Sequence, residues 1–379
     1  MAVGALQGIT VVALEQAVAA PLATSRLADA GARVIKLERP DGDSARHFDA
    51  HAKGSSSYFV WLNRNKQSCR VDLRNDEDIE LVRAMIAKAD VFIQNLAPGA
   101  TGRLGLGSKA LRAAYPRLIT CDISGYAANT PFADRKAYDL MIQGESGLAS
   151  ITGTADSGPS RVGVSICDIA TGMAAHAQLL EALIARGTTG QGRSIAVSLF
   201  DVATEIMNIP YITHRHGNAA PKPSGLLHPL IAPYGVYETR DRPLLIAVQS
   251  EQEWIKFCNT VLRRPDMAAD ARFGSNRLRI ENRPAMESEI IYIFQYIPYT
   301  EAITRLEEGR IAYAQISQMD DMVSHPALAK MMVAVAGQFV ELVAPPSIVD
   351  GRRPDPGTVP DLGAHDGMLR REFAHPGPA

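Results

Sequence analysis

The sequence predicts an α/β protein. Through its first half, short apolar segments suited to strands alternate with segments that have the composition of helices. The expected strands cover residues 10–14, 33–37, 91–94 and 118–123, and the expected helices cover residues 22–30 and 77–88. The chain has 379 residues, of which 46% are hydrophobic and 21% are charged, so it is long enough for two domains with sizeable cores.

The turn after the first expected strand bears on the kind of α/β domain. It reads Glu15-Gln-Ala-Val-Ala-Ala-Pro21 and lacks the Gly-x-Gly-x-x-Gly pattern. In dinucleotide-binding domains those glycines let a pyrophosphate approach the start of the next helix. The turn therefore argues against an NAD site, although a dinucleotide-binding domain is the obvious alternative for this order of elements.

Asp168 stands where a longer helix is expected to begin. The residues behind it carry apolar side chains and helix formers without proline up to Arg186. Backbone N–H groups in a first helical turn, with the positive end of the helix dipole, hold a carboxylate ionised and can bind an oxyanion beside it. Asp is also a preferred N-cap residue, so the position alone leaves two interpretations, a helix cap and a carboxylate nucleophile.

The middle of the chain contains the signs of a second domain. Residues 187–192 read as a Gly-rich turn, and residues 193–199 alternate as a half-buried strand before a helix that starts at Asp201. From about residue 217 to residue 233 the chain is rich in Pro and Gly. This segment predicts a crossover into a second region of roughly a hundred residues, where we expect the smaller domain.

Composition excludes several classes of partner. The net charge is −2, with 39 basic and 41 acidic residues and no run rich in Lys and Arg, so nothing indicates a nucleic-acid or anionic membrane surface. The sequence contains no apolar run of roughly eighteen residues and no signal-peptide pattern, so we expect a cytoplasmic protein without a membrane segment.

The cysteines and histidines do not predict a metal site. Cys69, Cys121, Cys167 and Cys258 are far apart and lack Cys-x-x-Cys spacing, which fits a reducing compartment. His214-Arg-His216 has no acidic residue or cysteine nearby in the sequence. We expect no bound metal.

Two neighbouring segments resemble the core of a known family. Lys136-Ala-Tyr-Asp139, with the residues up to Gly153, and then Val162-Gly-Val-Ser-Ile-Cys-Asp168 are similar to the core of the family III CoA-transferases, the formyl-CoA transferase and carnitine CoA-transferase relatives. Further blocks follow in the family's order across nearly the whole chain, among them Leu62-Asn-Arg-Asn-Lys-Gln-Ser68 and Gln94-Asn-Leu-Ala-Pro-Gly99.

The resemblance implies roles for individual residues. The aspartate that matches Asp168 is the family's nucleophile, and Tyr138 matches a tyrosine that closes on the reaction centre. The positions that match the family's contacts with CoA are Ala17, Val18, Arg39, Val71, Arg74, Asn95, Leu96, Arg103 and Lys136. Val18, Arg74 and Leu96 depart from the residues that some members carry. Arg215, His216 and His228 lie in or beside the crossover segment, and a second carboxylate on an acid substrate would need such a cation.

The resemblance also implies the architecture. Such proteins build a Rossmann-like large domain from both chain ends and a smaller α+β domain from the middle. The corresponding boundaries here are residues 1–216 and 331–379 for the large domain and 217–330 for the linker and small domain. Two subunits are expected to interlock like rings in a homodimer.

The chemistry expected from the resemblance is transfer of CoA from an acyl-CoA donor, such as succinyl-CoA, to a free carboxylic acid. Coenzyme A is then a substrate, and no tightly bound cofactor is expected. The closest likeness is to members that use C4 and C5 dicarboxylic acids. With an ordinary pKa of about 3.9, Asp168 would already be ionised at neutral pH, and N–H groups at the start of its helix would stabilise the oxyanions.

Two alternatives remain open from the sequence. An α-methylacyl-CoA racemase-like isomerase uses an aspartate at this position, but it needs a histidine base where this chain has Tyr138. A non-catalytic acyl-CoA-binding protein is the other, and the presence of Asp168 beside Tyr138 argues against it.

Overall fold

The computed structural model describes residues 4–217 and 220–373. The described residues form two compact units: unit 1 comprises residues 4–150, 161–217, 220–221 and 329–373, and unit 2 comprises Ile151–Ser160 and Lys222–Leu328. The sequence prediction placed the boundaries at residues 217 and 331. It did not separate residues 151–160 from the large domain.

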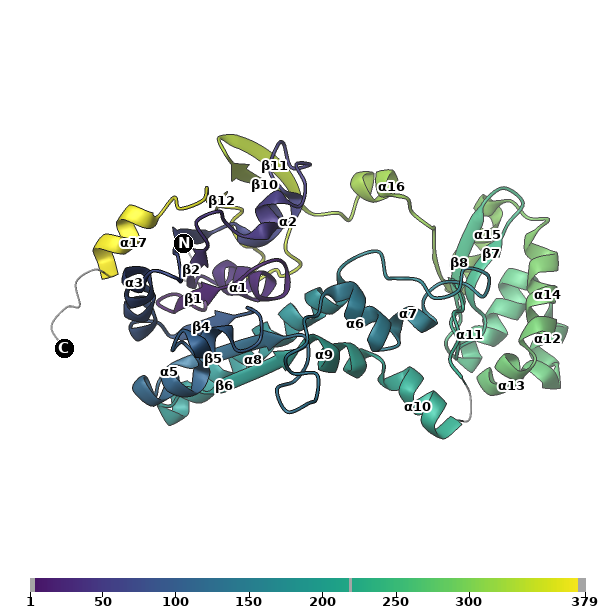
Figure 1. Ribbon diagram of the computed structural model, residues 1–379. Coiled ribbons are helices and arrows are strands. Elements are labelled where there is room, and N and C mark those ends of the chain that lie inside the picture. The colour runs from purple at the N-terminus through teal and green to yellow at the C-terminus, as the bar shows by residue number, and fades with distance from the viewer. Residues whose placement is uncertain (1–3, 218–219, 374–379) are drawn as a thin grey trace. The chain divides into compact units, whose positions relative to one another are not determined.

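Within the described residues, the largest sheet has six parallel strands in the order β3-β2-β1-β4-β5-β6, which confirms the predicted α/β class (Figure 1). Its strands are β1 (Thr10–Leu14), β2 (Arg33–Glu38), β3 (Lys66–Arg70), β4 (Val91–Gln94), β5 (Ile119–Ser124) and β6 (Ser194–Ser198). This order is that of a doubly wound nucleotide-binding fold, in which the direction of winding reverses between β1 and β4.

Helices cover both faces of this sheet. In unit 1 they are α1 (Ala19–Asp29), α2 (Ser57–Asn63), α3 (Asp76–Ala87), α4 (Ala100–Arg103), α5 (Ser108–Ala114), α6 (Asp139–Glu145), α8 (Ile166–Thr189), α9 (Leu199–Ile206), α10 (Asn208–Gly217) and α17 (Asp366–Phe373). Val11 and Ala13 pack toward α1 and α8, while Val12 and Leu14 pack toward α3 and α17. Successive residues of a strand face opposite sides, so an apolar run such as that of β1 fits a strand buried on both faces.

The C-terminal part of the chain returns to unit 1. Figure 1 shows α17, in yellow, beside α3, and Leu369 and Phe373 of α17 are buried in the same core as α3. The strands β10 (Lys330–Val335), β11 (Gln338–Val343) and β12 (Thr358–Val359) form a smaller sheet that packs with α2. Both chain ends therefore contribute to this unit.

Unit 2 is an α+β structure with its own core. Its antiparallel sheet has the order β7-β8-β9, and Trp254, Phe257 and Phe294 are among its buried residues. The elements are β7 (Tyr234–Glu238), β8 (Pro243–Ala247), α11 (Glu251–Lys256), α12 (Pro265–Ala269), α13 (Asn276–Glu281), α14 (Arg283–Phe294), α15 (Tyr299–Gly309), β9 (Ala312–Ala314) and α16 (Met319–Ser324). The short helix α7 (Leu148–Ile151) spans the junction of the two chain segments.

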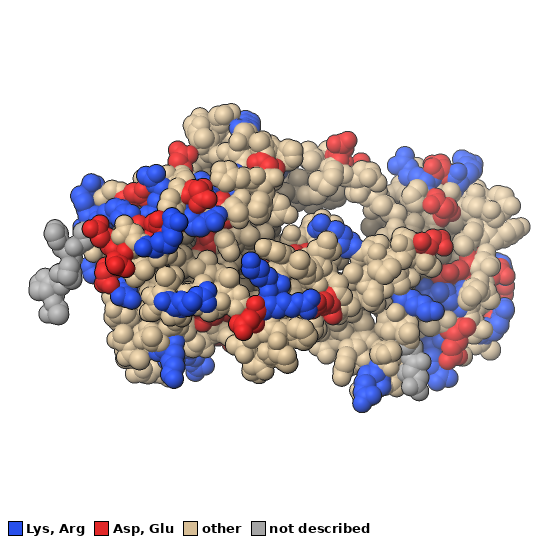
Figure 2. Space-filling view, in the orientation of Figure 1, with Lys and Arg blue, Asp and Glu red and all other residues tan. Residues whose placement is uncertain are grey.

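Across the part of the chain that the structure describes, no helix has the length and apolar character needed to cross a membrane. On the face of the molecule that Figure 2 shows, basic and acidic side chains are intermixed. This agrees with the nearly balanced charge of the sequence.

Candidate active site

A cavity of about 290 Å³ lies in unit 1 at the carboxyl ends of β1, β4 and β5. Residues from four parts of the chain and two single residues line it: Gln16, Ala17 and Ala19 after β1, Asn95 to Pro98 after β4, Ile123 to Gly125 at the end of β5, and Arg135 to Tyr138 before α6, with Asp168 and Leu199. In open α/β sheets, ligands bind outside the carboxyl ends of the strands where the winding reverses. In this sheet the winding reverses between β1 and β4, and the cavity lies at the carboxyl ends of these two strands.

Asp168 is the third residue of α8 and lines the cavity. The N-cap of α8 is Ser165, so the interpretation of Asp168 as a helix cap is wrong. Burial, with a smaller contribution from the negative charge of Asp139, raises the pKa of Asp168 to about 7. The expectation of a carboxylate fully ionised at neutral pH is therefore also wrong.

Burial is the larger cause of this raised pKa, and the smaller one is Asp139, a buried residue in the first turn of α6. Its Oδ1 accepts hydrogen bonds from the backbone N–H groups of Cys167, at 2.8 Å, and of Asp168, at 3.3 Å. Two of the first-turn donors of α8 are thus engaged by another carboxylate. These two N–H groups therefore do not hold Asp168 ionised, and they are not available to an oxyanion. The sequence had predicted both roles for them.

Gln143 fixes this arrangement from the next turn of α6. Its Nε2 donates to Oδ2 of Asp139 at 2.6 Å, and its Oε1 accepts from the backbone N–H of Val162 at 2.8 Å. The segment that leads into Asp168 is therefore tied to α6 by the buried side chains of Asp139 and Gln143. Sequence reasoning gave neither residue a role, although Asp139 directly follows Tyr138 in the motif.

Gly172 brings the start of α8 close to the start of α1. A Cβ atom at this position would lie 2.6 Å from the carbonyl oxygen of Ala19 and 2.9 Å from Cβ of Leu22. Only glycine allows this approach without a backbone shift. The close packing places Asp168 against the β1–α1 turn.

The β1–α1 turn is held by side chains from three other parts of unit 1. Ala17 adopts a left-handed conformation with φ of 59°, which is unfavourable for a residue other than glycine. Lys36 Nζ donates to the Glu15 carbonyl at 3.3 Å, and Asp43 Oδ1 accepts from the Ala17 N–H at 3.2 Å. Asn95 accepts from the Gln16 N–H at 2.9 Å and donates to the Gln16 carbonyl at 2.8 Å.

A buried ionic network supports this turn from below. Lys36 Nζ lies 2.8 Å from Asp43 and 3.5 Å from Glu15, and Lys66 Nζ lies 2.7 Å from Glu15, with the side chains fully buried. Burial lowers the pKa of Lys66 to about 8. For Lys36, burial acts in the same direction, but the carboxylates of Glu15, Asp43 and Glu38 outweigh it and raise the pKa.

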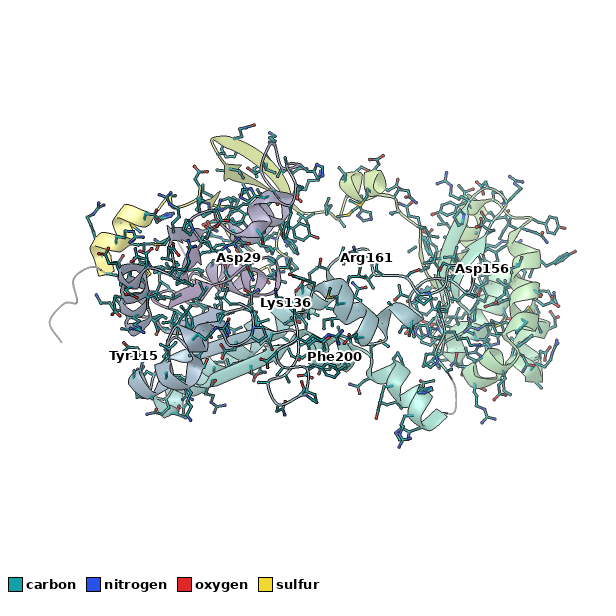
Figure 3. All side chains as sticks on the ribbon, viewed as in Figure 1. Asp29, Tyr115, Lys136, Asp156, Arg161 and Phe200 are labelled. Atoms are coloured by element: carbon teal, nitrogen blue, oxygen red, sulfur yellow. The ribbon has the colours of Figure 1, made fainter. Side chains whose placement is uncertain are left out.

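The cavity brings together only part of the predicted site. Of the residues singled out in the sequence, those that line it are Asp168, Tyr138, Ala17, Asn95, Leu96 and Lys136. Tyr138 is 68% exposed, and Lys136, labelled in Figure 3, is also exposed on the segment that leads into α6. Gln16 and Arg135 line the cavity as well, and the sequence analysis had not singled them out.

The other predicted CoA contacts lie outside this cavity. Val18 is buried against Leu22 and Leu62, and Val71 lines a second cavity beside β3. The remaining three are exposed arginines: Arg39 pairs with Asp41 at 3.6 Å, Arg74 pairs with Asp72 at 2.8 Å, and Arg103 ends α4.

Two of the residues expected to bind a second carboxylate belong to unit 1 but do not line its cavity. Arg215 and His216 are exposed in the last turn of α10. His228 belongs to unit 2, where its ring stacks on Tyr234 with centroids 5.2 Å apart. Within the described residues, no group of three or more His, Cys, Asp or Glu side chains could hold a metal ion.

Comparison with known proteins gives matches to one family, both in sequence and in structure. The sequence model of CoA-transferase family III matches residues 6–366. A succinate–glutarate CoA-transferase of Agrobacterium fabrum is 33% identical over 85% of this chain and 82% of its own. An acetyl-CoA:oxalate CoA-transferase of Acetobacter aceti is 30% identical over 98% and 97%. The crystal structure of a CaiB/BaiF family protein from Brucella suis aligns with a TM-score of 0.80 and 32% identity, over 97% of this chain and 99% of that one.

Proposed function

The chain belongs to CoA-transferase family III, and we propose that it moves CoA from an acyl-CoA donor to a free dicarboxylic acid with Asp168 as the nucleophile. The observation that carries the proposal is the position of Asp168 in a cavity at the reversal point of the sheet, opposite the anchored β1–α1 turn. Tyr138 and Lys136 line the same cavity.

The reaction follows from carboxylate chemistry. The ionised Asp168 carboxylate attacks the thioester carbonyl; a C–O bond forms, the C–S bond breaks, and CoA leaves as a thiolate while a mixed anhydride remains on Asp168. The thiolate then attacks the aspartyl carbonyl, which releases the donor acid and leaves an aspartyl thioester. The acceptor carboxylate repeats these two exchanges in reverse order, forming the new acyl-CoA and restoring Asp168.

Two features of the cavity bear on this chemistry. Burial raises the pKa of Asp168 to about 7, so the nucleophile gains and loses its proton in the neutral pH range. The cationic side chain of Lys136 lines the cavity where negative charge develops on the thioester oxygen and on the departing thiolate. We assign Lys136 to the CoA half of the substrate.

The choice of dicarboxylic acids rests on the relatives. The relative from Agrobacterium fabrum is named for succinate and glutarate, and the relative from Acetobacter aceti is named for oxalate. Each of these acids has two carboxylates. Succinyl-CoA is the donor we propose. Ala17, Asn95 and Leu96 are proposed to contact CoA in the cavity; Val18, Arg39, Val71, Arg74 and Arg103 remain predicted contacts for the rest of the molecule.

The assembly and location are also proposals. Apolar side chains are exposed along α8, α9 and α10, including Met173, Ile184, Ile206, Ile209 and Ile212. An interlocked homodimer would remove such side chains from water. We propose this assembly, a cytoplasmic location, and CoA as a substrate rather than a resident cofactor.

The racemase-like alternative lacks its second base at this site. Among the described residues, those that line the cavity include no histidine, and Tyr138 occupies the position where the racemase-like enzymes need one. An acyl-CoA-binding protein without activity would require no nucleophile. Unlike the proposed transferase, neither alternative predicts a covalent adduct on Asp168.

The proposal is tested by intact-protein mass spectrometry after incubation with succinyl-CoA, with Asp168→Asn as the matched variant. We expect a succinyl or CoA adduct on the wild-type protein, its release by hydroxylamine, and a loss of turnover of at least about 1,000-fold in the variant. An adduct on both proteins would place the nucleophile elsewhere. No adduct with a panel of acyl-CoAs would support one of the alternatives.

A further inference from the structure

Among the described residues, three charged side chains line the cavity: Asp168, Lys136 and Arg135. The proposed reaction uses Asp168 as nucleophile and Lys136 for CoA. Arg135 has no role in that scheme. A dicarboxylic substrate, however, carries a second anionic group that must also be accommodated.

Arg135 is held by the end of α6. Its Nη2 lies 2.7 Å from Oε1 of Glu145, and the hydroxyl of Tyr126 donates to Oε2 of the same glutamate at 2.5 Å. The guanidinium also lies 5.6 Å from the ring centroid of Phe132 and 5.9 Å from that of Tyr126. These contacts fix the direction of the side chain before any substrate binds.

The guanidinium retains capacity for a further partner. An arginine side chain has five N–H donors in a planar fork that matches a carboxylate, and the ion pair with Glu145 engages one edge of it. About half of the Arg135 side chain, 52%, is exposed, so a solute in the cavity can reach it. Lys136, by contrast, offers a single point charge on a flexible stem.

We propose that Arg135 binds the second, non-reacting carboxylate of the dicarboxylic acid while the first carboxylate reacts at Asp168. This inference rests on the proposed function and names the residue that sets its substrate class. It replaces the expectation for Arg215 and His216, which belong to unit 1 but do not line its cavity. Arg135 thus discriminates between acids that have a second carboxylate and acids that lack one.

The test compares two acceptors with the same number of carbon atoms, glutarate and valerate, with acetyl-CoA as the donor so that only the acceptor carries a second carboxylate. For Arg135→Gln, we expect the ratio of kcat/KM for glutarate to that for valerate to fall about 10- to 100-fold, chiefly through a higher KM for glutarate. The kcat/KM for valerate should stay within about threefold of the wild-type value, since valerate makes no contact that the substitution removes.

Two further variants separate substrate binding from a structural role. Glu145→Gln keeps the arginine but removes its ion pair, so we expect a smaller loss of the glutarate preference than in Arg135→Gln. Arg83→Gln removes an exposed arginine that pairs with Glu80 at 2.6 Å outside the cavity, and its substrate ratio should equal that of the wild type. Equal losses for both acids in Arg135→Gln would show that the residue only holds its segment in place and would overturn the inference.

The outcomes distinguish the two proposals. If Asp168 forms its adduct and the glutarate-to-valerate ratio is unchanged in Arg135→Gln, the inference about Arg135 fails and the proposed function stands. If the wild-type protein forms no adduct with any acyl-CoA, both fail together. A wild-type preference for valerate over glutarate would also overturn the assignment of Arg135.

Discussion

The two walls of the cavity are built in different ways. The β1–α1 turn is anchored at the backbone of Glu15, Gln16 and Ala17, and fully buried charges lie directly beneath it. The opposite segment, Arg135 to Tyr138, is largely exposed, and Tyr138 has 68% of its surface in contact with solvent. One wall is therefore part of the folded core, while the other has most of its surface free for contact with a ligand.

The difference has an energetic consequence. Removing one partner from a buried charge pair leaves the other uncompensated in a poorly solvated place and costs about 3–5 kcal/mol. An exposed ion pair contributes only about 0–1 kcal/mol. The anchored wall should thus couple activity to folding stability, whereas the exposed wall should affect activity with little change in stability.

The largest expected effect comes from Asp43→Ala. The substitution removes the acceptor for the Ala17 N–H and leaves buried Lys36 without its nearest carboxylate, so we expect the free energy of unfolding to fall by about 3–5 kcal/mol. Displacement of the turn should also lower kcat by about 100-fold at a temperature where the variant remains folded. Denaturant unfolding and steady-state kinetics measure the two effects.

The matched control for that variant is Asp29→Ala. Asp29 pairs with buried Arg64, but neither residue lines the cavity. We expect a comparable loss of stability with kcat within about threefold of wild type, because the turn keeps its anchors. If both variants lost activity equally, instability alone would explain the result and the anchored wall would have no separate role in catalysis.

The sequence predicted most of the sheet but not β3. Strands such as β1 and β4 are continuous apolar runs, which are recognisable without tertiary information. The strand β3 reads Lys-Gln-Ser-Cys-Arg, a polar segment whose Lys66 and Ser68 are buried because Glu15 and Glu38 accept their hydrogen bonds. Lys66 and Glu15 are 51 positions apart, so local pattern could not reveal the pair.

The candidate site shows the same limit. Matching motifs identified Asp168 and Tyr138, which the fold brings to one cavity. The positive end of α8 was expected to act on Asp168, yet Asp139, 29 positions earlier in the sequence, occupies its donors. The prediction for Arg215 rests on its residue type and on the expected closeness of the crossover segment to the active site, and neither criterion determines which side chains line a cavity.

Asp139→Asn tests how Asp139, which joins α6 to the start of α8, affects the pKa of Asp168. Burial and, to a smaller extent, the charge of Asp139 raise the pKa of Asp168 to about 7, so the rate of enzyme acylation should rise with pH through that value as the nucleophile loses its proton. The asparagine removes the charge and keeps an acceptor for the Cys167 N–H. The midpoint should therefore move to lower pH while remaining above that of an ordinary aspartate, since burial is the larger cause.

Single-turnover acylation measured between pH 5 and pH 9 gives that midpoint. Gln143→Glu is the opposite test, because it adds a carboxyl group next to Asp139 and, where ionised, increases the negative charge near Asp168. We expect its midpoint to move to higher pH. Identical profiles for all three proteins would mean that Asp139 has no electrostatic influence on the nucleophile.

The smallest expected effect on the fold comes from Tyr138→Phe, in the exposed wall. The substitution removes only the hydroxyl of a side chain that is 68% exposed, so the free energy of unfolding should change by no more than about 0.5 kcal/mol. If the hydroxyl contacts the reacting groups once substrate is bound, kcat should fall roughly 3- to 10-fold, the value of one hydrogen bond. Tyr138→Phe and Asp43→Ala would then separate on a plot of activity against stability, because one lowers kcat alone and the other lowers both. A stability loss in Tyr138→Phe as large as that in Asp43→Ala would instead show that the exposed wall also belongs to the core, and the distinction between the two walls would not hold.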